Sequence, residues 1–241
     1  MGTSIRIDFH THILPGMDDG CVDVDMSLAQ LKLAADHKID VVIATSHFYP
    51  HAESVESFLR RREDAWKRLQ ARRENVNPVV KLGAEVLICN GMEKMDGIKS
   101  LCVEHSNVLL VEMPFIYPWD SKLLQTVMKL KEEKGLEVIL AHGERYPRKE
   151  IEPLMEQGFF IQLNVAATAK RIPSSFVKHS IKQGCVAGLG SDLHGKEDHY
   201  KQFTRSMLLW GEEAEWIMLK TEQLLKNKKN EVEEAKGGLS W

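Results

Sequence analysis

The sequence predicts a single α/β domain that folds as a distorted barrel of seven strand–helix units. Apolar runs alternate with amphipathic segments about seven times along the chain. A length of 241 residues, 43% of them hydrophobic, suits one barrel with one large core. Histidines and carboxylates follow several of the apolar runs, at the strand ends where barrel proteins form their sites. The expected fold class is therefore a (β/α)7 TIM-like barrel with a metal site at the C-terminal strand ends.

Each expected strand is a short run rich in Val, Ile and Leu. The first ends in His10 and His12 and continues into an acidic turn that glycines bound. The others are expected at residues 41–45, 79–89, 108–111, 138–141, 159–164 and 186–189. Helical crossovers between them predict a parallel sheet, so the carboxyl ends of the strands share one face.

The helices are expected where apolar residues recur at helical spacing. Asn77-Pro78 closes the helix at 54–75, because a residue before proline avoids helical geometry, and Gly135 ends the helix at 119–134. The remaining helices are expected at 27–37, 151–157, 174–183 and 199–227. One barrel domain is therefore expected over residues 1–227, and the charged tail over 228–241 is expected to be frayed.

The composition excludes several classes of protein. A net charge of −3 gives no broad basic field, so nucleic acid and anionic membranes are not expected partners. No apolar run approaches the roughly 18 residues of a membrane span, and the N-terminus has no apolar signal core. The four cysteines include no Cys-x-x-Cys pair and fit reduced thiols. Together these features predict a cytoplasmic protein without membrane insertion.

The stretch from Asp8 to Gly20 predicts half of a metal site. Alternate residues of a strand point to the same face, so His10 and His12 can bind one ion together. Asp18 and Asp19 lie in the turn that follows, where an oxygen ligand can fold back over the strand end. A pair of structural histidines is the alternative for an isolated His-x-His. The rest of the chain decides between these two interpretations.

Other candidate ligands lie at the ends of other expected strands, and one lies within a strand. They are His47, Glu85, Glu112, His142, Asp192 and His194. Polar residues with only structural roles would fall at both ends of a barrel, whereas these gather at one. A mixed shell of imidazole and carboxylate suits zinc, manganese or iron and leaves coordination positions open. Arg145, three residues after His142, can present a planar guanidinium to an anion bound there.

Six motifs together resemble the polymerase-and-histidinol-phosphatase (PHP) superfamily of metal hydrolases. They are the opening His-x-His, Thr-Ser-His47, Gly83-Ala-Glu85, Val-Glu112-Met-Pro, Ala-His142-Gly-Glu-Arg145-Tyr and Gly-Ser-Asp192-Leu-His194. The His-Thr-His-Ile-Leu-Pro-x-x-Asp-Asp-Gly opening and the His-x-Glu-Arg-Tyr loop resemble more narrowly its bacterial tyrosine-phosphatase branch, which is associated with capsule and exopolysaccharide control. The match runs in order from Asp8 to His194.

The resemblance implies two to three divalent ions, manganese first, with iron or zinc as alternatives. It implies a first metal held by His10, His12, Glu85 and Asp192, a second held by Glu85, Glu112 and His142, and a third held by Asp19, His47 and His194. Arg145 would bind the phosphate. The family loop usually reads His-Pro-Glu-Arg, where this chain has Gly143. An arginine often found after the final histidine is also missing, which leaves Lys196 as a weak candidate for a second phosphate contact.

The expected reaction is hydrolysis of phosphotyrosine, in which a metal-bridging hydroxide attacks phosphorus in line. Arg145, Glu85 and His194 are the expected catalytic residues, and the partner implied is a phosphotyrosine protein such as a bacterial tyrosine kinase. A phenol leaves readily, so a general acid is not essential; His194 and His51 are the candidates for one. No cysteine has an arginine six positions later, which argues against thiol-based phosphatase chemistry.

Three alternative functions share parts of this pattern. A histidinol-phosphate phosphatase would use the same metals on an alkyl phosphate. A PHP-type nuclease should carry a basic groove, which a net charge of −3 does not provide. A regulatory binding module without activity should lack ligands, and none is missing.

Two charged groups are expected to be structural. Asp18, Asp23 and Asp25 lack the spacing of a calcium loop and are expected to be solvated acids of a turn and a helix start. The basic run from Arg60 to Arg73 is interrupted by acidic residues, so a solvated helix face is preferred over a nucleic-acid or phosphoprotein contact.

Overall fold

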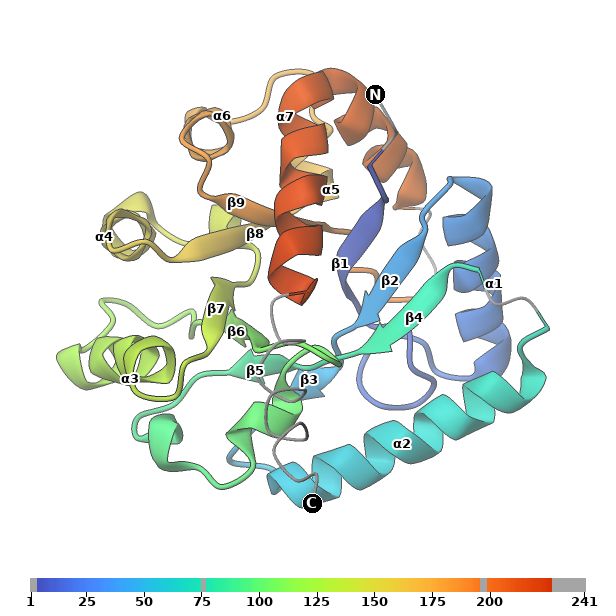
Figure 1. The fold of residues 1–241 in the computed structure, drawn as a ribbon, viewed down its shortest axis with the longest axis horizontal. Helices are drawn as coiled ribbons and strands as arrows, with labels where there is room; N and C mark the ends of the chain where they lie inside the picture. Colours follow the sequence, from blue (N-terminus) through green and yellow to red (C-terminus); the bar gives the residue numbers. More distant parts are fainter. Residues whose placement is uncertain (1–3, 75–76, 196–198, 227–241) are drawn as a thin grey trace, which may run out of the picture.

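Parallel strands surround the centre of the molecule and helices pack on their outer side (Figure 1). The computed structural model describes residues 4–74, 77–195 and 199–226. Its strands are β1 (Ile7–Thr11), β2 (Val41–Ala44), β3 (His47–Phe48), β4 (Val79–Leu82), β5 (Glu85–Leu87), β6 (Val108–Glu112), β7 (Glu137–Leu140), β8 (Phe160–Asn164) and β9 (Val186–Gly190). All the pairings between these strands are parallel, as the helical crossovers predict.

The strands form a three-stranded sheet, β1-β2-β4, and a six-stranded sheet, β3-β5-β6-β7-β8-β9. A bridge between Thr11 and Leu193 joins the two ends of this arrangement. There the amide of Asp192 donates to the carbonyl of His10 over 2.8 Å. The expected distorted barrel is therefore confirmed.

The distortion comes from two chain segments that each contribute to both sheets. The sequence predicts one strand at 79–89, but the chain breaks at Gly83 and Ala84 into β4, which pairs with β2, and β5, which pairs with β3. The expected strand at 41–45 is likewise followed by the short strand β3. The single-strand prediction for 79–89 is wrong because the two halves bond to different partners. The break allows Glu85 to begin β5 beside His47.

The helices are α1 (Val24–Asp36), α2 (Val55–Arg72), α3 (Ser121–Glu132), α4 (Arg148–Glu156), α5 (Val165–Thr168), α6 (Ser175–Lys182) and α7 (Tyr200–Lys226), with 3-10 turns η1 (Met92–Lys94), η2 (Ile98–Leu101) and η3 (Gly143–Arg145). Side chains of Asp23, Ser54, Asp120 and Ser174 cap the starts of α1, α2, α3 and α6. The expected helices are present with shifted ends, whereas α5 was not predicted. Lys196, the end of the expected helix at 54–75 and the tail at 228–241 lie outside the described residues.

The basic face of α2 is more than a solvated surface. Arg61 and Arg68 donate to the carbonyls of Met17 and Pro15, over 3.1 and 2.8 Å, in the acidic turn after β1. Arg62 donates to the carbonyl of Gly83 over 2.9 Å at the break before β5. These hydrogen bonds hold two segments that carry candidate ligands. The expectation of a purely solvated helix face is therefore wrong for these three arginines.

No helix of the described segments combines the length and apolar character that a membrane span requires. Buried aliphatic and aromatic side chains of the strands, such as Phe9 and Leu163, belong to one apolar core. Gly188 leaves room for this packing, since a Cβ there would lie 2.8 Å from the ring of Phe9. The polar residues at the strand ends stand above this apolar core.

Candidate metal centre and active site

Nine side chains predicted as ligands converge at the carboxyl ends of the strands. They are His10 and His12 of β1, Asp19 of the following turn, His47 of β3, Glu85 of β5, Glu112 of β6, His142 after β7, and Asp192 and His194 after β9. Within each of the three groups that could hold an ion, the ligand atoms lie within 4.8 Å of one another. Residues up to 184 positions apart along the chain, such as His10 and His194, thus form one cluster.

Glu85 lies at the centre of this cluster. Its Oε2 lies 3.1 Å from Nε2 of His10, 3.4 Å from Nε2 of His12 and 3.0 Å from Nδ1 of His47. Its other oxygen, Oε1, lies 3.0 Å from Nε2 of His142. The two oxygens of one carboxylate therefore face different histidines, which is the arrangement that a bridging ligand requires.

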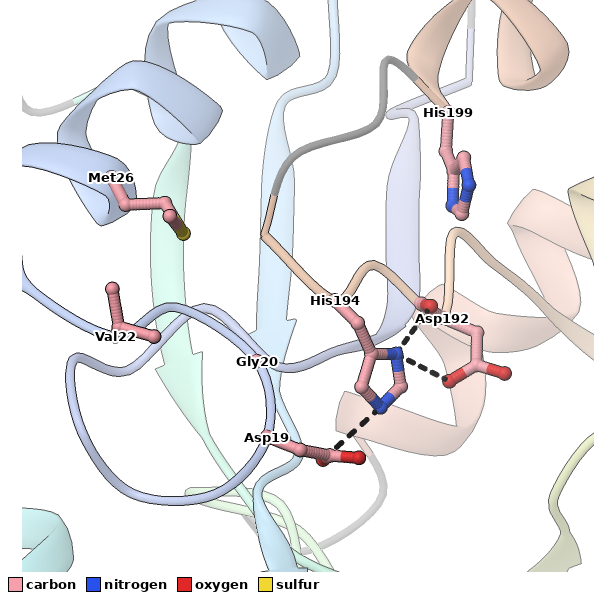
Figure 2. Close-up of a pocket in the computed structure, with 7 residues that line it drawn as sticks. All are labelled: Asp19, Gly20, Val22, Met26, Asp192, His194 and His199. Atoms are coloured by element: carbon pink, nitrogen blue, oxygen red, sulfur yellow. Dashed lines mark hydrogen bonds and ion pairs between the residues drawn. The ribbon is translucent and has the colours of Figure 1, made fainter.

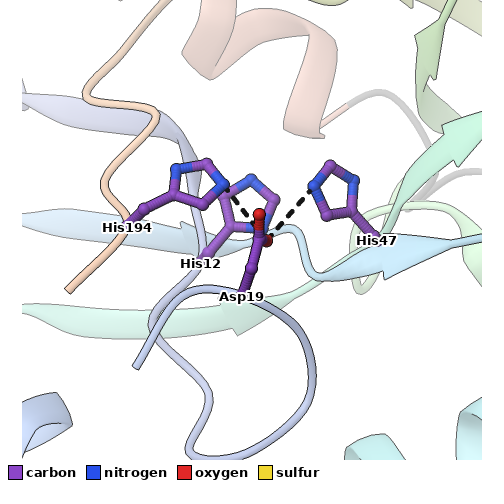
Figure 3. Close-up of side chains that lie close together, drawn as sticks. All are labelled: His12, Asp19, His47 and His194. Carbon is purple, nitrogen blue, oxygen red and sulfur yellow. Dashed lines mark ion pairs between the residues drawn. The ribbon is translucent and has the colours of Figure 1, made fainter. Parts of the chain in front are cut away.

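The remaining candidate ligands extend the cluster in two directions. Asp192 Oδ1 lies 3.6 Å from Nε2 of His10 and 3.5 Å from Nε2 of His12. On the other side, Asp19 Oδ1 lies 3.3 Å from Nε2 of His194 and 3.6 Å from Nε2 of His47, and Figure 3 shows it between these rings. His12 belongs to both groups, and His47 also groups with Glu85 and Glu112. The three ligand sets implied by the sequence are therefore contiguous. The groups that the structure forms share His12 and His47, whereas the implied third set shares no member with the other two.

The ionisation of the cluster fits bound cations. Burial by itself would raise the pKa of Glu85, but the histidines around it, His10 foremost, hold that pKa well below its ordinary value. Burial would lower the pKa of His12, yet hydrogen bonds with Asp18, Asp192 and Glu85 raise it well above the ordinary value. Glu85 Oε2 is buried and accepts no hydrogen bond of normal geometry from the described residues. Divalent ions placed between these atoms would replace the protons and satisfy the carboxylates.

Two glycines make room for the histidines. A Cβ at Gly190, at the end of β9, would lie 2.5 Å from Cβ of His10. A Cβ at Gly20 would lie 2.2 Å from the carbonyl oxygen of His12. Side chains at these two positions would displace β1 from the cluster, so the strand end and its ligands depend on both glycines.

The backbone turns sharply at two of the predicted ligands. His142 and Asp192 have φ values of 33° and 49°, in the left-handed region that non-glycine residues rarely adopt. Each follows the last residues of a strand, β7 or β9, and directs its side chain toward the cluster. Backbone strain of this kind collects at functional sites.

Sequence reasoning missed three residues that hold the ligands. Asp18, expected to be solvated, is buried: its Oδ2 lies 3.0 Å from Nδ1 of His12 and accepts from the amide of His47 over 3.0 Å. Gln162 and Asn164 of β8 form a buried chain from His10 to Asp192. The signal for these two was present, since they are polar residues at alternate positions of an otherwise apolar strand. Nothing in the sequence distinguishes Asp18 from Asp19, because only the fold of the turn separates them.

Comparison with known proteins places the chain in a family. The model of the family described as "Capsular polysaccharide synthesis, CpsB/CapC" matches residues 6–209. The chain belongs to this family. It is 27% identical over 201 residues to the tyrosine-protein phosphatase YwqE of Bacillus subtilis (strain 168), covering 78% of this chain and 77% of that protein. It is 24% identical over 210 residues to the tyrosine-protein phosphatase CpsB of Streptococcus pneumoniae, covering 78% and 82%.

A solved structure is also similar to this CpsB/CapC chain. It is described as YwqE from Bacillus subtilis and CpsB from Streptococcus pneumoniae, "unique metal-dependent tyrosine phosphatases". The match has a TM-score of 0.74 at 25% identity and covers 92% of this chain and 95% of that one. The family resemblance predicted from the motifs and the barrel fold are thereby confirmed.

In this CpsB/CapC barrel, Arg145 lies in η3 beside the cluster without joining it. Its Nη1 is 3.7 Å from Oδ2 of Asp192, and its side chain is 48% exposed. The guanidinium carbon lies 4.8 Å from the centroid of the Phe115 ring. A half-exposed guanidinium held at the edge of a set of metal ligands can receive an anion from solvent.

A cleft opens from the side of the cluster where Asp19 and His194 lie (Figure 2). Its lining consists of Asp19, Gly20, Val22, Met26, Asp192, His194 and His199. The Nδ1 atom of His194 lies 2.9 Å from the carbonyl oxygen of Asp192, which leaves Nε2 directed at Asp19.

His51, the other general acid considered from the sequence, is exposed, and its ring centroid lies 5.8 Å from that of Tyr49. Tyr49 in turn stacks on His47, with ring centroids 5.1 Å apart.

Proposed function

We propose that this chain is a metal-dependent protein-tyrosine phosphatase. Membership of the CpsB/CapC family and the names of its relatives support the reaction class. The observation that carries the proposal is the position of Arg145, which places a half-exposed guanidinium 3.7 Å from Asp192 at the edge of the ligand cluster. A metal site with an adjacent planar cation suits a phosphate group, which carries several negatively charged oxygens.

The ligand assignment is part of this proposal. His10, His12, Glu85 and Asp192 would hold one metal ion, Glu85 with Glu112 and His142 a second, and Asp19, His47 and His194 a third. The short distances around Glu85 support its role as the bridge. We propose two to three divalent ions, manganese first, because a shell of imidazole and carboxylate without thiolate suits manganese, iron or zinc. Such ions would acidify a water molecule and neutralise charge on the phosphate.

The protein groups contribute binding and orientation. Arg145 would donate to the nonbridging phosphate oxygens, and its two-pronged geometry would orient the phosphorus toward the cluster. The leaving phenolate has a conjugate acid of pKa about 10, so it departs with little protonation. His194 lines the cleft and would act as a metal ligand, because its Nε2 lies 3.3 Å from Asp19 Oδ1 and its Nδ1 lies 2.9 Å from the carbonyl oxygen of Asp192.

The cellular context is a further part of the proposal. We infer that the substrate is a phosphotyrosine protein such as a bacterial tyrosine kinase, and that the reaction regulates capsule or exopolysaccharide synthesis, as the family description suggests. In the part of the chain that the structure describes, Cys21, Cys89, Cys102 and Cys185 form no disulfide, which supports a reducing compartment such as the cytoplasm.

A substrate panel tests the proposed function. Metal-loaded protein is compared on a phosphotyrosine peptide, a phosphoserine peptide, histidinol phosphate and single-stranded DNA. We expect the highest kcat/KM on the phosphotyrosine peptide and loss of that activity after treatment with a strong chelator. Preference for histidinol phosphate or for DNA would replace the proposal with one of the alternative metal hydrolases. Absence of turnover on all four would leave the regulatory binding module.

A further inference from the structure

The loop between β6 and α3, which begins after the candidate ligand Glu112, exposes two large apolar side chains. Phe115 is 45% exposed and Ile116 is 81% exposed. They follow Glu112, the predicted ligand at the end of β6, by three and four positions. Single exposed apolar residues are common on protein surfaces, so the meaning of this pair depends on what surrounds it.

Phe115 contacts the residues of the active site. Its ring centroid lies 4.8 Å from the guanidinium carbon of Arg145. It also lies 5.8 Å from the centroid of His142, with the two rings inclined by 23°. The exposed ring thus touches both the proposed phosphate-binding residue and a predicted metal ligand. Any group attached to a phosphate on Arg145 would come close to this ring.

The loop that carries Phe115 and Ile116 is braced on both sides. Before them, the amide of Met113 donates to the hydroxyl of Tyr146 over 2.9 Å. After them, the indole of Trp119 donates to the carbonyl of Pro114 over 2.9 Å and stands edge-on to the Tyr146 ring. The exposure of the two apolar side chains is therefore built into a supported loop and does not come from a loose one.

We propose that Phe115 and Ile116 form an apolar wall that receives the aromatic ring of phosphotyrosine while Arg145 binds its phosphate. This inference rests on the proposed function and names the residues that would select aryl over alkyl phosphates. An aryl ring gains contact with Phe115 and Ile116 in the bound state, because aromatic pairs attract in offset or edge-on geometry. A phosphoserine side chain carries no ring and gains nothing from the wall.

A competing role for Phe115 is to position Arg145 through the cation–π contact alone. The two roles predict different results. A ring that only positions Arg145 affects every phosphate ligand equally, whereas a wall for the aryl group affects aryl ligands alone or more strongly. The test therefore compares two ligands that share a phosphonate and differ in the attached group.

The experiment measures binding of phenylphosphonate and methylphosphonate to metal-loaded protein by titration calorimetry. The wild type is expected to prefer the phenyl ligand. Phe115→Ala should weaken phenylphosphonate binding about three- to tenfold more than methylphosphonate binding. Phe115→Leu should retain part of the preference. Equal loss for both ligands, or no loss for either, overturns the wall.

Two further variants keep the test decisive. Ile116→Ala truncates a side chain that is 81% exposed, so the fold should survive, and it too should reduce the phenyl preference. Leu208→Ala, at a residue of α7 that is 79% exposed, is the matched control and should leave binding of both ligands unchanged. Metal content and thermal melting of each variant show whether the site is intact. If Ile116→Ala folds, binds metal and keeps the wild-type preference, Ile116 is not part of the wall.

Kinetics separate this inference from the proposed function. If the wild type does not hydrolyse phosphotyrosine peptide, the proposed function fails, and the phosphonate preference still decides whether the wall exists. If the wild type hydrolyses the peptide while Phe115→Ala and Ile116→Ala keep its ratio of kcat/KM on phosphotyrosine over phosphoserine peptide, the wall fails and the proposed function stands.

Discussion

The side-chain oxygen of Gln162 lies 3.0 Å from Nδ1 of His10. The partners of the Gln162 oxygen and nitrogen determine which of these two atoms is the donor. The same oxygen accepts from the backbone amide of His142 over 2.7 Å. At the other end, the Gln162 amide nitrogen donates to Asn164, which donates in turn to the carboxylate of Asp192. Nδ1 of His10 must therefore be the donor, which leaves Nε2 of a neutral ring free to bind a metal.

Replacing Gln162 should weaken the metal site without removing a ligand. We expect Gln162→Leu to lower metal affinity about 10- to 100-fold, because the ring of His10 loses the acceptor that orients it. Titration of metal-free protein with manganese, followed by calorimetry, measures the change. The control is Thr221→Val, which removes another buried hydrogen bond, that from Thr221 to the carbonyl of Ala187. Equal metal affinity in the wild type and Gln162→Leu would contradict the orienting role.

Replacing Asp18 should also weaken the metal site, because Asp18 orients the ring of His12. Its carboxylate binds Nδ1 of His12, and the pKa of Asp18 is lowered strongly by His12 in spite of burial. Asp18→Asn keeps the size but turns a donor toward His12 or His47, so metal affinity should fall about tenfold. Asp25→Asn, at an exposed residue paired with Arg72, is the control. Metal titration showing the same loss in both variants would assign the effect to charge alone.

Glu85→Ala should abolish phosphatase activity while the fold survives. The carboxylate approaches His10, His12, His47 and His142, so its removal takes one ligand from two proposed metals together. Elemental analysis should show loss of metal, and circular dichroism should show retained helix. Glu93→Ala is the control for loss of a buried carboxylate, because Glu93 of η1 is buried and pairs with Lys129 of α3. Near-normal turnover in Glu85→Ala would refute the bridging role.

Arg145→Ala should separate phosphate binding from metal binding. Loss of one strong electrostatic donor costs on the order of 10²-fold in rate, so turnover of a phosphotyrosine peptide should fall by about that factor with metal content unchanged. Arg145→Lys should recover only part, because lysine keeps the charge without the two-pronged geometry. Arg148→Ala, three residues later at an exposed ion pair with Glu152, is the control. If Arg145→Ala loses metal, the residue supports the cluster and not the substrate.

The stability of the metal-free protein should fall as the pH rises. Burial would lower the pKa of His142, but hydrogen bonds with Glu112 and Glu85 raise it from 6.5 to about 9. The protonated ring therefore stabilises the folded state fully below pH 6.5, and this stabilisation is lost as the pH rises toward 9. Metal binding needs the neutral His142 ring, so the stabilisation that added metal gives to the folded state should increase as the pH rises from 6.5 toward 9.

Thermal melting of metal-free protein at pH 6.5 and pH 9 measures this change. The melting temperature should be lower at the higher pH, and the difference between metal-loaded and metal-free protein should widen. His105→Gln, at an exposed histidine, is the control and should keep the wild-type dependence. A metal-free protein that is more stable at the higher pH would show that the cluster does not hold its extra protons.

The sequence by itself predicted the parallel barrel and the nine side chains that converge at its strand ends. The alternation of apolar runs with amphipathic helices is a local property, and residues at the carboxyl ends of parallel strands must gather on one face. His10 and His12 share a face because alternate strand residues do so, wherever the strand is placed. These conclusions needed no knowledge of which distant segments touch.

Only the tertiary structure decided the break between β4 and β5, the burial of Asp18 and the contact of Phe115 with Arg145. Each depends on partners far away in the chain: β4 and β5 bond to different strands, and arginines of α2 hold the turn that buries Asp18. Likewise, Gln162 can orient His10 only because the fold brings β8 close to β1. Local patterns cannot reveal such contacts, since the free energy that selects them comes from packing between segments distant in sequence.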